Sequence, residues 1–327
     1  MPTAIELTCP RCGTALPARA DACVGCGLEV ALEGGVVDVI GARAREDRAA
    51  GVEDFYSVSP FPGYGAGDDG PTLLDRSRRS AYLDGLDRSL APDARVLDLG
   101  CGTGQTAAFL ALASPAREVW GADGCRASLA LADGFRERAR IENLRLVRAD
   151  LFDLPFEGGS FPTVVCRGVV HHTPEPWRAI EVAAALVAPG GTLVLGFYET
   201  RARLFHRARR GLSRVLGRPV GLFDPVLRRR DVDPEKKRIW IDDQYRHPLE
   251  HILPLPRVLA CLESAGLRFV RTIPPAPRGE SLFDAASEPS ARGIAALRAG
   301  WALAGVTDPD AGLVCVVARR PAHEGLR

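Results

Sequence analysis

The sequence predicts an α/β fold built on a mostly parallel β-sheet. The main observation is segment 96–104, Val-Leu-Asp-Leu-Gly-Cys-Gly-Thr-Gly, where a hydrophobic run ends in a carboxylate and three glycines follow at alternate positions. A stretch compatible with a helix, 105–113, comes next. This order is typical of a buried strand, a tight turn and a helix N-terminus. Glycine leaves the backbone of such a turn open to close approach by a ligand.

Later strands that end beside acidic residues support this fold. The second strand, 118–123, ends in Asp123, and the third strand, 144–149, is followed by Asp150. The carboxyl ends of parallel strands meet at one edge of a sheet, where ligands bind. We further expect a fourth strand at 163–167 after Pro162, which is tolerated at a strand start, a helix at 179–187, a turn at 189–191 and a fifth strand at 192–197.

The flanking segments complete the expected order of elements. A single helix at 72–90 leads into the first strand, and residues 41–54 form a linker or a short helix. The C-terminal part is expected to hold a helix at 256–265, a strand at 267–273, the segment Pro274–Pro277, a helix at 291–303 and a last strand at 312–319.

The spacing of the glycines indicates the kind of ligand. Dinucleotide-binding turns follow G-x-G-x-x-G, whereas Gly100, Gly102 and Gly104 form G-x-G-x-G directly after Asp98. A carboxylate beside the loop suits a ligand that carries positive charge rather than a diphosphate. S-adenosylmethionine, with its ammonium and sulfonium groups, fits this description.

On these motifs the chain resembles the class I S-adenosylmethionine-dependent methyltransferases, in the subgroup like the ubiquinone and menaquinone methyltransferases, mainly over residues 73–200. The resemblance implies a Rossmann-like sheet of seven strands, of which the last is antiparallel. It implies that Asp123 accepts the ribose hydroxyls, that Asp150 takes the adenine amino group, and that the amide of Leu151 meets the ring. The expected cofactor-binding residues are Asp98, Gly100, Cys101, Gly102, Gly104, Asp123, Gly124, Asp150, Leu151, Arg167 and Tyr64.

An aromatic segment, 55–64, precedes this domain and contains four aromatic residues and two prolines. Two interpretations stay open. Its rings could pack over a sulfonium, whose charge the π-face attracts, or they could pin the loop to the core.

The acceptor end of the site is expected after the fourth strand, where Gly168–His172 would face the methionine moiety. Histidine titrates near neutral pH and can remove a proton from an acceptor. We therefore take His171 or His172 as base or acceptor ligand, with Tyr245 and His247 as second candidates; the alternative is that the histidines only pack. Segment 240–251 resembles an Asp-Gln-Tyr-x-His-Pro-x-Glu motif in a group of bacterial methyltransferases. It is interpreted as acceptor recognition or as a polar turn.

Two C-x-x-C-G knuckles near the N-terminus indicate a zinc ribbon. Cys9, Cys12, Cys23 and Cys26 can present four thiolates to one structural Zn²⁺. A hairpin is expected after them, with strands at 28–32 and 36–40. The alternatives are disulfides, which are rare in cytosolic proteins, or cysteines without a shared role. Whether the ribbon contacts substrate or only stabilises its module stays open.

Residues 201–250 form an insertion where this family places acceptor-binding lids. Residues 201–230 hold ten arginines against Asp224 alone, a local charge of +9 in a chain of net charge +1. Apolar residues within 204–216 share one helical face. That helix could contact nucleic-acid phosphates, lie on an anionic membrane, or pack its apolar face on the domain with its arginines in solvent.

The expected organisation is a zinc ribbon at 1–40, a linker and aromatic loop at 41–72, and a methyltransferase domain at 73–327 with the lid at 201–250. No apolar run approaches the ~20 residues of a membrane span, and no signal peptide is recognisable, so a cytoplasmic location is expected. The leading function is methyl transfer from S-adenosylmethionine to a small-molecule or lipid-like acceptor. The alternatives are an RNA base methyltransferase, whose ribbon and basic insert would bind RNA, and a non-catalytic cofactor-binding regulator.

Overall fold

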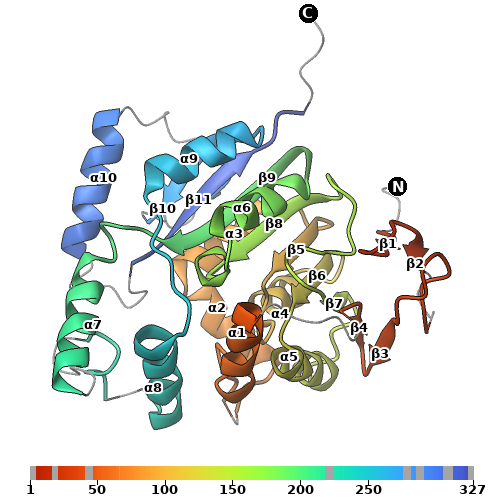
Figure 1. The fold of residues 1–327 in the computed structure, drawn as a ribbon, viewed down its shortest axis with the longest axis horizontal. Coiled ribbons are helices and arrows are strands. Elements are labelled where there is room, and N and C mark those ends of the chain that lie inside the picture. The colour runs from red at the N-terminus through yellow and green to blue at the C-terminus, as the bar shows by residue number, and fades with distance from the viewer. Residues whose placement is uncertain are drawn as a thin grey trace, which may run out of the picture.

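The chain folds around one large β-sheet with helices on both faces, and a small two-stranded sheet lies beside it (Figure 1). The structure is a computed structural model. It describes all residues except 1–4, 17–20, 41–46, 66, 218–223, 231, 275–280, 285–290, 305–311 and 323–327. The predicted linker residues 41–46 and the segment Pro275–Pro277 therefore lie outside the described residues. No helix among the described residues combines the length and apolar character that a membrane span requires.

The large sheet has nine strands in the order β10-β11-β9-β8-β5-β6-β7-β4-β3, and β1 and β2 form the small one. Strands β4 to β9 of the large sheet run parallel, whereas β11 and β3 are antiparallel to their neighbours. The strands are β1 (Leu7–Thr8), β2 (Ala15–Leu16), β3 (Ala31–Glu33), β4 (Val36–Asp38), β5 (Arg95–Leu99), β6 (Glu118–Asp123), β7 (Leu144–Arg148), β8 (Phe161–Arg167), β9 (Val187–Tyr198), β10 (Arg268–Ile273) and β11 (Leu313–Arg319).

Helices cover the two faces of this sheet and enclose two apolar cores. Helices α4 and α5 pack on one face, with α2 and α3 against α4, whereas α6 and α9 pack on the other. Side chains alternate between the faces, so that Val164 and Val165 enter different cores. The helices are α1 (Asp47–Val58), α2 (Gly70–Arg78), α3 (Ala81–Ser89), α4 (Gln105–Ala113), α5 (Arg126–Arg138), α6 (Pro176–Ala185), α7 (Leu204–Leu216), α8 (Pro234–Ile241), α9 (Leu255–Ser264) and α10 (Ala291–Ala304).

The Rossmann-like sheet of seven strands is confirmed, with β11 as its antiparallel strand, and the N-terminal hairpin adds two more. The expected hairpin is present as β3 and β4, and β4 pairs in parallel with β7. The side chains of this edge are tied by Arg148, which donates to Asp38 at 2.7 Å and to Glu53 of α1 at 3.1 Å. Both Arg148 and Asp38 are buried. The hairpin is thus joined to the core sheet by backbone and side chains.

Two expectations about the helices before β5 are corrected by the structure. The single helix at 72–90 is wrong: α2 ends at Arg78, and Ser80 caps a new helix by accepting a hydrogen bond from the Leu83 amide at 3.4 Å. The aromatic segment is not a loop throughout, because α1 extends to Val58 and carries Phe55 and Tyr56. The expected turn at 189–191 lies within β9, where Gly190 has a φ of +78°.

The orientation of helix α7 contradicts one of the three interpretations of its amphipathic sequence. Its apolar side chains do not pack on the domain: Val215 is 83% exposed and Leu216 53% exposed. The buried side carries polar residues instead, among them His206, Arg209 and Ser213. The interpretation with an apolar face packed on the domain is therefore wrong: Arg203 and Arg209 are buried in its place, whereas Arg207 and Arg214 are exposed.

Candidate active site

A cavity of about 710 Å³ opens where β5, β6, β7 and β8 end. Strand β5 lies between β6 and β8, at the point where the order of the strands reverses direction along the sheet. Ligands of α/β sheets bind at this switch point. The cavity has the size of a site for a cofactor or a small molecule. Of the residues predicted for the site, those that line it are Asp98, Gly100, Cys101, Gly102, Asp123, Gly124, Asp150, Leu151, Arg167 and His172.

The glycine loop needs glycine at each of its alternate positions. Gly100, Gly102 and Gly104 have φ angles of +72°, +53° and +75°, a region that other residues enter only at a cost. A Cβ on Gly102 would lie 2.6 Å from the carbonyl oxygen of Phe61. Gly104 does not line the cavity but precedes α4 as its N-cap. The loop therefore presents backbone to the cavity.

Asp123 sits at the end of β6 and shapes this loop. Its Oδ2 accepts a hydrogen bond from the Gly102 amide and its Oδ1 accepts one from the Cys125 amide, each at 2.8 Å. Burial raises the pKa of this carboxyl despite these amide donors. A carboxylate oxygen can accept more than one hydrogen bond. The two oxygens can thus still receive a pair of hydroxyls from the cavity.

Asp98 lies at the end of β5 and is only 5% exposed. Burial raises its pKa to about 7, and the nearby negative charge of Asp123 acts in the same direction. Arg167, whose guanidinium lies 4.8 Å from the centre of the Tyr82 ring, opposes this shift. A buried carboxyl of raised pKa is suited to receive a cationic group, which favours its ionised form.

The loop after β7 forms the next wall. Asp150 is exposed and holds its loop by accepting a hydrogen bond from the Phe152 amide at 2.8 Å. Leu151 and Phe152 supply apolar surface beside it. A carboxylate next to apolar side chains suits a heteroaromatic ring with an amino group.

Tyr64 does not take the place that the sequence predicts for it. Its ring stacks on Phe135 with centroids 4.5 Å apart, and its hydroxyl donates to the Thr103 carbonyl at 2.9 Å. Tyr64 thus pins the segment to the core, outside the cavity. The aromatic side chains of this segment that do line the cavity are Tyr56 and Phe61.

The two histidines after β8 occupy different positions. His172 lines the cavity, whereas His171 is fully buried behind it, and neither of its ring nitrogens has a partner among the described residues. His172 Nδ1 donates to the Leu249 carbonyl at 2.8 Å, so Nε2 carries the lone pair. Burial lowers the pKa of both rings well below the usual range. Both are therefore neutral at physiological pH.

Segment 240–251 reaches the cavity through residues other than those singled out from the sequence. Asp243 and Gln244 line it from the π-helical turn Asp242–Arg246. Tyr245 points elsewhere and donates to Asp224 at 2.7 Å. His247 is also outside the cavity, but its ring lies 3.7 Å from that of His172, centroid to centroid. Asp242 and Asp243 are adjacent acidic residues in a polar segment, and the sequence does not indicate which of the two side chains faces the cavity.

Asp243 is held by a buried network. Gln244 donates to Asp243 at 2.7 Å and to the Tyr198 hydroxyl at 2.8 Å, and Arg203 donates to the Gln244 carbonyl oxygen Oε1 at 2.6 Å. The Tyr56 hydroxyl donates to Asp243 from α1 at 3.4 Å. Burial raises the pKa of Asp243 to about 6. This carboxylate can accept a proton near neutral pH.

The four cysteines meet at the N-terminal knuckles. Their sulfurs all lie within 4.8 Å of one another, and the Cys9–Cys26 and Cys12–Cys23 sulfur distances are both 3.5 Å. Four sulfurs at Zn–S bonds of ~2.3 Å in a tetrahedron are about 3.8 Å apart. The donor set and its spacing therefore fit a structural Zn²⁺.

The ribbon also borders the cavity. The Thr8 amide donates to the Pro155 carbonyl at 2.9 Å, which docks the first knuckle on the loop after β7. Pro10, Arg11 and Leu28 consequently line the cavity beside Leu151 and Phe152. The ribbon forms a wall of the site, which no motif in the cysteine pattern indicates.

Comparisons with known proteins agree with this geometry. Residues 97–195 match the family model of the methyltransferase domain. The chain is 29% identical over 198 residues to an uncharacterised protein of Synechococcus, covering 54% of this chain and 48% of that one. It is 32% identical over 131 residues to the demethylmenaquinone methyltransferase of Clavibacter sepedonicus, covering 39% of this chain and 52% of that one. The chain thus spans about half the length of these relatives.

A solved structure shows the same fold. PKMT2 from Rickettsia typhi, in complex with AdoHcy, has a TM-score of 0.50 and 17% identity, covering 81% of this chain and 57% of that one. At this identity the likeness concerns the fold alone. Together with the glycine loop and the strand order, the family match is decisive, and residues 97–195 form a methyltransferase domain of this family.

Proposed function

We propose that this chain transfers a methyl group from S-adenosylmethionine to a small-molecule or lipid-like acceptor. The observation that carries the proposal is one cavity lined by the glycine loop, Asp98, Asp123 and Asp150 at one end and by His172 and Asp243 at the other. Relatives named as methyltransferases of demethylmenaquinone and of 27-O-demethylrifamycin SV support the choice of acceptor class.

Different residues would hold the different parts of S-adenosylmethionine, the methyl donor. Asp150 and Leu151 would hold the adenine, and both oxygens of Asp123 would accept the ribose hydroxyls. Asp98 and the glycine loop would hold the cationic methionine end. Bound S-adenosylmethionine supplies an activated methyl group, so the protein mainly aligns the reactants and excludes water.

A proton must leave when the acceptor is a hydroxyl or a carbon acid. Asp243 is the proposed proton acceptor, because it faces the cavity and its pKa of about 6 leaves it ionised at neutral pH. His172 would position the acceptor through Nε2. His171 has no access to the cavity and is assigned a packing role.

The zinc ribbon belongs to the proposal as a stabilising module and as the outer wall of the adenine end. A cytoplasmic location stays part of the proposal, because reducing conditions keep metal-binding thiols free of disulfides. Arg203 and Arg209, counted in the basic insert, are buried. This burial reduces the basic surface available to RNA.

The test uses purified protein with methyl-labelled S-adenosylmethionine and a cell extract divided into lipid, small-metabolite, protein and RNA fractions. Label in the lipid or small-metabolite fraction, lost in an Asp123→Ala variant, is expected. Label in RNA that nuclease removes would refute the proposed acceptor class. Tight donor binding without label in any fraction would refute the enzymatic proposal in favour of a regulator.

A further inference from the structure

Helix α7 exposes an apolar face to solvent. This face, called the α7 apolar face, consists of Leu204, Phe205, Leu212, Val215 and Leu216, which are 38–83% exposed. Single exposed apolar residues are ordinary, but a contiguous stripe of five large side chains on one helix marks an interaction site. The helix lies at the periphery of the molecule, next to α10 and away from the sheet (Figure 1).

The protein fixes this orientation from the opposite side of the helix. Arg203 donates to Glu250 at 2.8 Å, and Arg210 forms an ion pair with the same carboxylate at 2.8 Å. His206 shares a hydrogen bond of 3.1 Å with the Gln244 carbonyl. Since charged side chains are buried only with partners, rotation of the helix would break these contacts. The apolar stripe is thus held outward by the fold.

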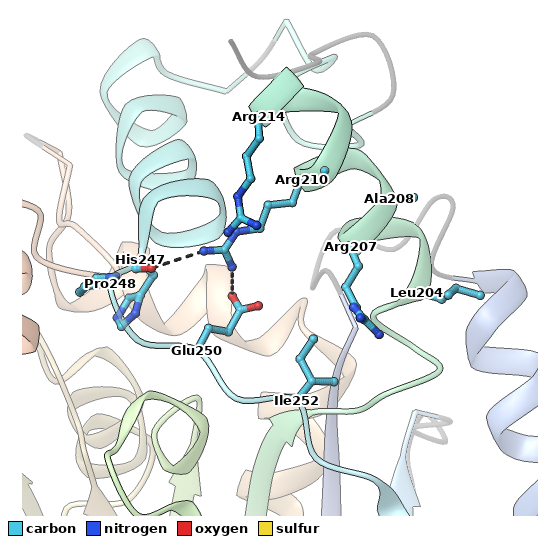
Figure 2. A pocket seen from close by; sticks show the side chains of 10 residues that line it. Leu204, Arg207, Ala208, Arg210, Arg214, His247, Pro248, Glu250 and Ile252 are labelled. Atoms are coloured by element: carbon cyan, nitrogen blue, oxygen red, sulfur yellow. Dashed lines mark hydrogen bonds and ion pairs between the residues drawn. The ribbon is translucent and has the colours of Figure 1, made fainter. Parts of the chain in front are cut away.

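A basic cavity borders the α7 apolar face. It has a volume of about 700 Å³, and its lining includes Arg207, Arg210 and Arg214 along one wall. Figure 2 shows these side chains on the same side of the cavity, with Glu250 and Ile252 opposite them. Among the described residues, neither Arg207 nor Arg214 has an acidic partner, and both are exposed. Two free positive charges therefore flank the apolar stripe.

We propose that α7 docks this protein on the surface of an anionic lipid bilayer. The α7 apolar face would enter the boundary between headgroups and acyl chains, and Arg207 and Arg214 would bind lipid phosphates in the adjoining cavity. Apolar side chains with arginines beside them are the features by which helices lie in a membrane interface. Arginine forms paired hydrogen bonds with phosphate oxygens.

The charge distribution favours a bilayer over the other possible occupants. A second copy of this chain packed through α7 would cover the apolar face, but its own α7 contains no Asp or Glu to pair with Arg207 and Arg214. RNA would engage Arg207 and Arg214 but would leave Val215 and Leu216 in water. A bilayer with acidic headgroups covers both kinds of side chain at once. It is therefore the occupant that the observations support.

The surface also lies close to the proposed active site. His247 lines the basic cavity, and its ring centroid is 3.7 Å from that of His172. His172 lines the active-site cavity at the ends of β5 to β8, called the donor cavity. A protein docked through α7 would hold its acceptor end beside the lipid. This consequence rests on the proposed function, whereas the docking itself does not require methyl transfer.

The test is flotation with phosphatidylcholine vesicles that contain phosphatidylglycerol, compared with pure phosphatidylcholine vesicles. Leu212→Gln and Val215→Gln test the apolar face, and Arg207→Gln and Arg214→Gln test the basic cavity. Leu131→Gln on α5 is the matched apolar control, because Leu131 is 42% exposed and Leu212 43%. Arg78→Gln on α2, an exposed arginine, is the basic control. Affinity for S-adenosylhomocysteine reports whether each variant is folded.

We expect binding to the anionic vesicles that falls about tenfold in each apolar variant and about fivefold per arginine removed, with both controls unchanged. Binding to neutral vesicles should be weaker, and salt should weaken binding to the anionic ones. No flotation of the unmodified protein, or equal flotation of all variants, overturns the proposal. So does a stable dimer in solution that Leu212→Gln dissociates, or arginine-dependent binding to RNA but not to vesicles. If the unmodified protein floats with the vesicles but transfers no labelled methyl group to any fraction, the proposed function is refuted and the docking proposal stands.

Discussion

The hydroxyl of Tyr56 donates a hydrogen bond to Asp243 at 3.4 Å, although 187 positions separate the two residues. Tyr56 comes from α1 and Asp243 from the turn after α8, so the contact closes one end of the donor cavity from two sides. Burial raises the pKa of Tyr56 well above its usual range, which keeps the phenol protonated as the donor. The carboxylate of Asp243 is therefore the group that accepts this hydrogen bond.

The first prediction concerns Asp243→Asn. Turnover with an acceptor that loses a proton is expected to fall about 100-fold or more, while affinity for S-adenosylhomocysteine stays within a factor of two to three, roughly what a neutral isostere permits. The acidic limb of the rate profile near pH 6, set by the raised pKa of this carboxyl, should disappear. Steady-state rates from pH 5 to 8 measure it. An unchanged limb in the variant would assign the titration to another group.

Asp123→Ala is expected to remove donor binding, because both oxygens are lost and the Gly102 amide loses its acceptor. Calorimetry with S-adenosylhomocysteine should show an affinity at least about 100-fold lower, since each lost bond to a charged group contributes ~1.5–3 kcal/mol. Asp93→Ala, at an exposed carboxyl outside the cavity, is the control. Near-normal affinity in Asp123→Ala would contradict the assignment of the ribose site.

Asp98 predicts a pH dependence of stability and of donor binding. Its pKa rises from 3.8 to about 7 on folding, so the folded state binds the proton more tightly than the unfolded state. The stability that this group contributes is full below about pH 4 and is lost as the pH rises through 7. Urea unfolding of the protein without S-adenosylmethionine should show that its free energy of unfolding falls between about pH 4 and 7. The fall should be steeper than in the Asp98→Asn variant.

A cationic donor should reverse this shift, because it favours the carboxylate. Binding near pH 7 is then accompanied by proton release, which calorimetry in two buffers of different ionisation enthalpy measures. Equal heats in the two buffers would show that Asp98 does not face the charged end of the donor.

Gly102→Ala is expected to weaken both the fold and the donor site. The new methyl group meets the Phe61 carbonyl at a positive φ, and the strain is of the order of 1–3 kcal/mol. Gly300→Ala is the matched control, since Gly300 lies in α10 with open space around it and should gain up to about 1 kcal/mol from helix propensity. Thermal unfolding should show a lower unfolding temperature for Gly102→Ala and an unchanged or higher one for Gly300→Ala. A stable Gly102→Ala protein with normal affinity would show that the loop can move away.

Removal of the proposed Zn²⁺ is expected to affect more than the ribbon. Cys9→Ser should lower the metal content and the unfolding temperature, and it should weaken donor binding several-fold, because Pro10 and Arg11 line the cavity. Cys261→Ser, at a half-buried thiol on α9, is the control. Metal analysis, thermal unfolding and calorimetry measure the three effects. Full affinity in the metal-free protein would reduce the ribbon to a separate module.

Much of the fold is predictable because local sequence patterns encode it. Helix α4 and strand β6 have the bounds that the sequence predicts, since glycines and acidic residues mark their ends. The break between α2 and α3 is less visible, because Ser80 is an N-cap only in a chain that already turns there. The parallel pairing of β4 with β7 joins distant segments, and no pattern within either strand specifies it.

The site is predictable to a similar degree. The cofactor-facing residues follow strands and a glycine loop, so their backbone positions fix where they lie. The acceptor end depends on tertiary contacts: Asp243 faces the cavity while Tyr245 turns to Asp224. Helix α7 has a strong amphipathic pattern, but amphipathicity does not state which face meets the protein. Arg203 decides it through Gln244 and Glu250.

The contact between Asp38 and Arg148 spans 110 positions of the chain, and it sets an order of events during synthesis. The knuckles leave the ribosome before β7 and can fold locally, but β4 pairs only with β3 until β7 has emerged. Until then the edge of β4 that later pairs with β7 is open to other chains, as unpaired strand edges generally are. A nascent chain that stalls before residue 148 therefore carries an incomplete sheet, and completion of β7 adds the parallel pairing that makes the N-terminal hairpin part of it.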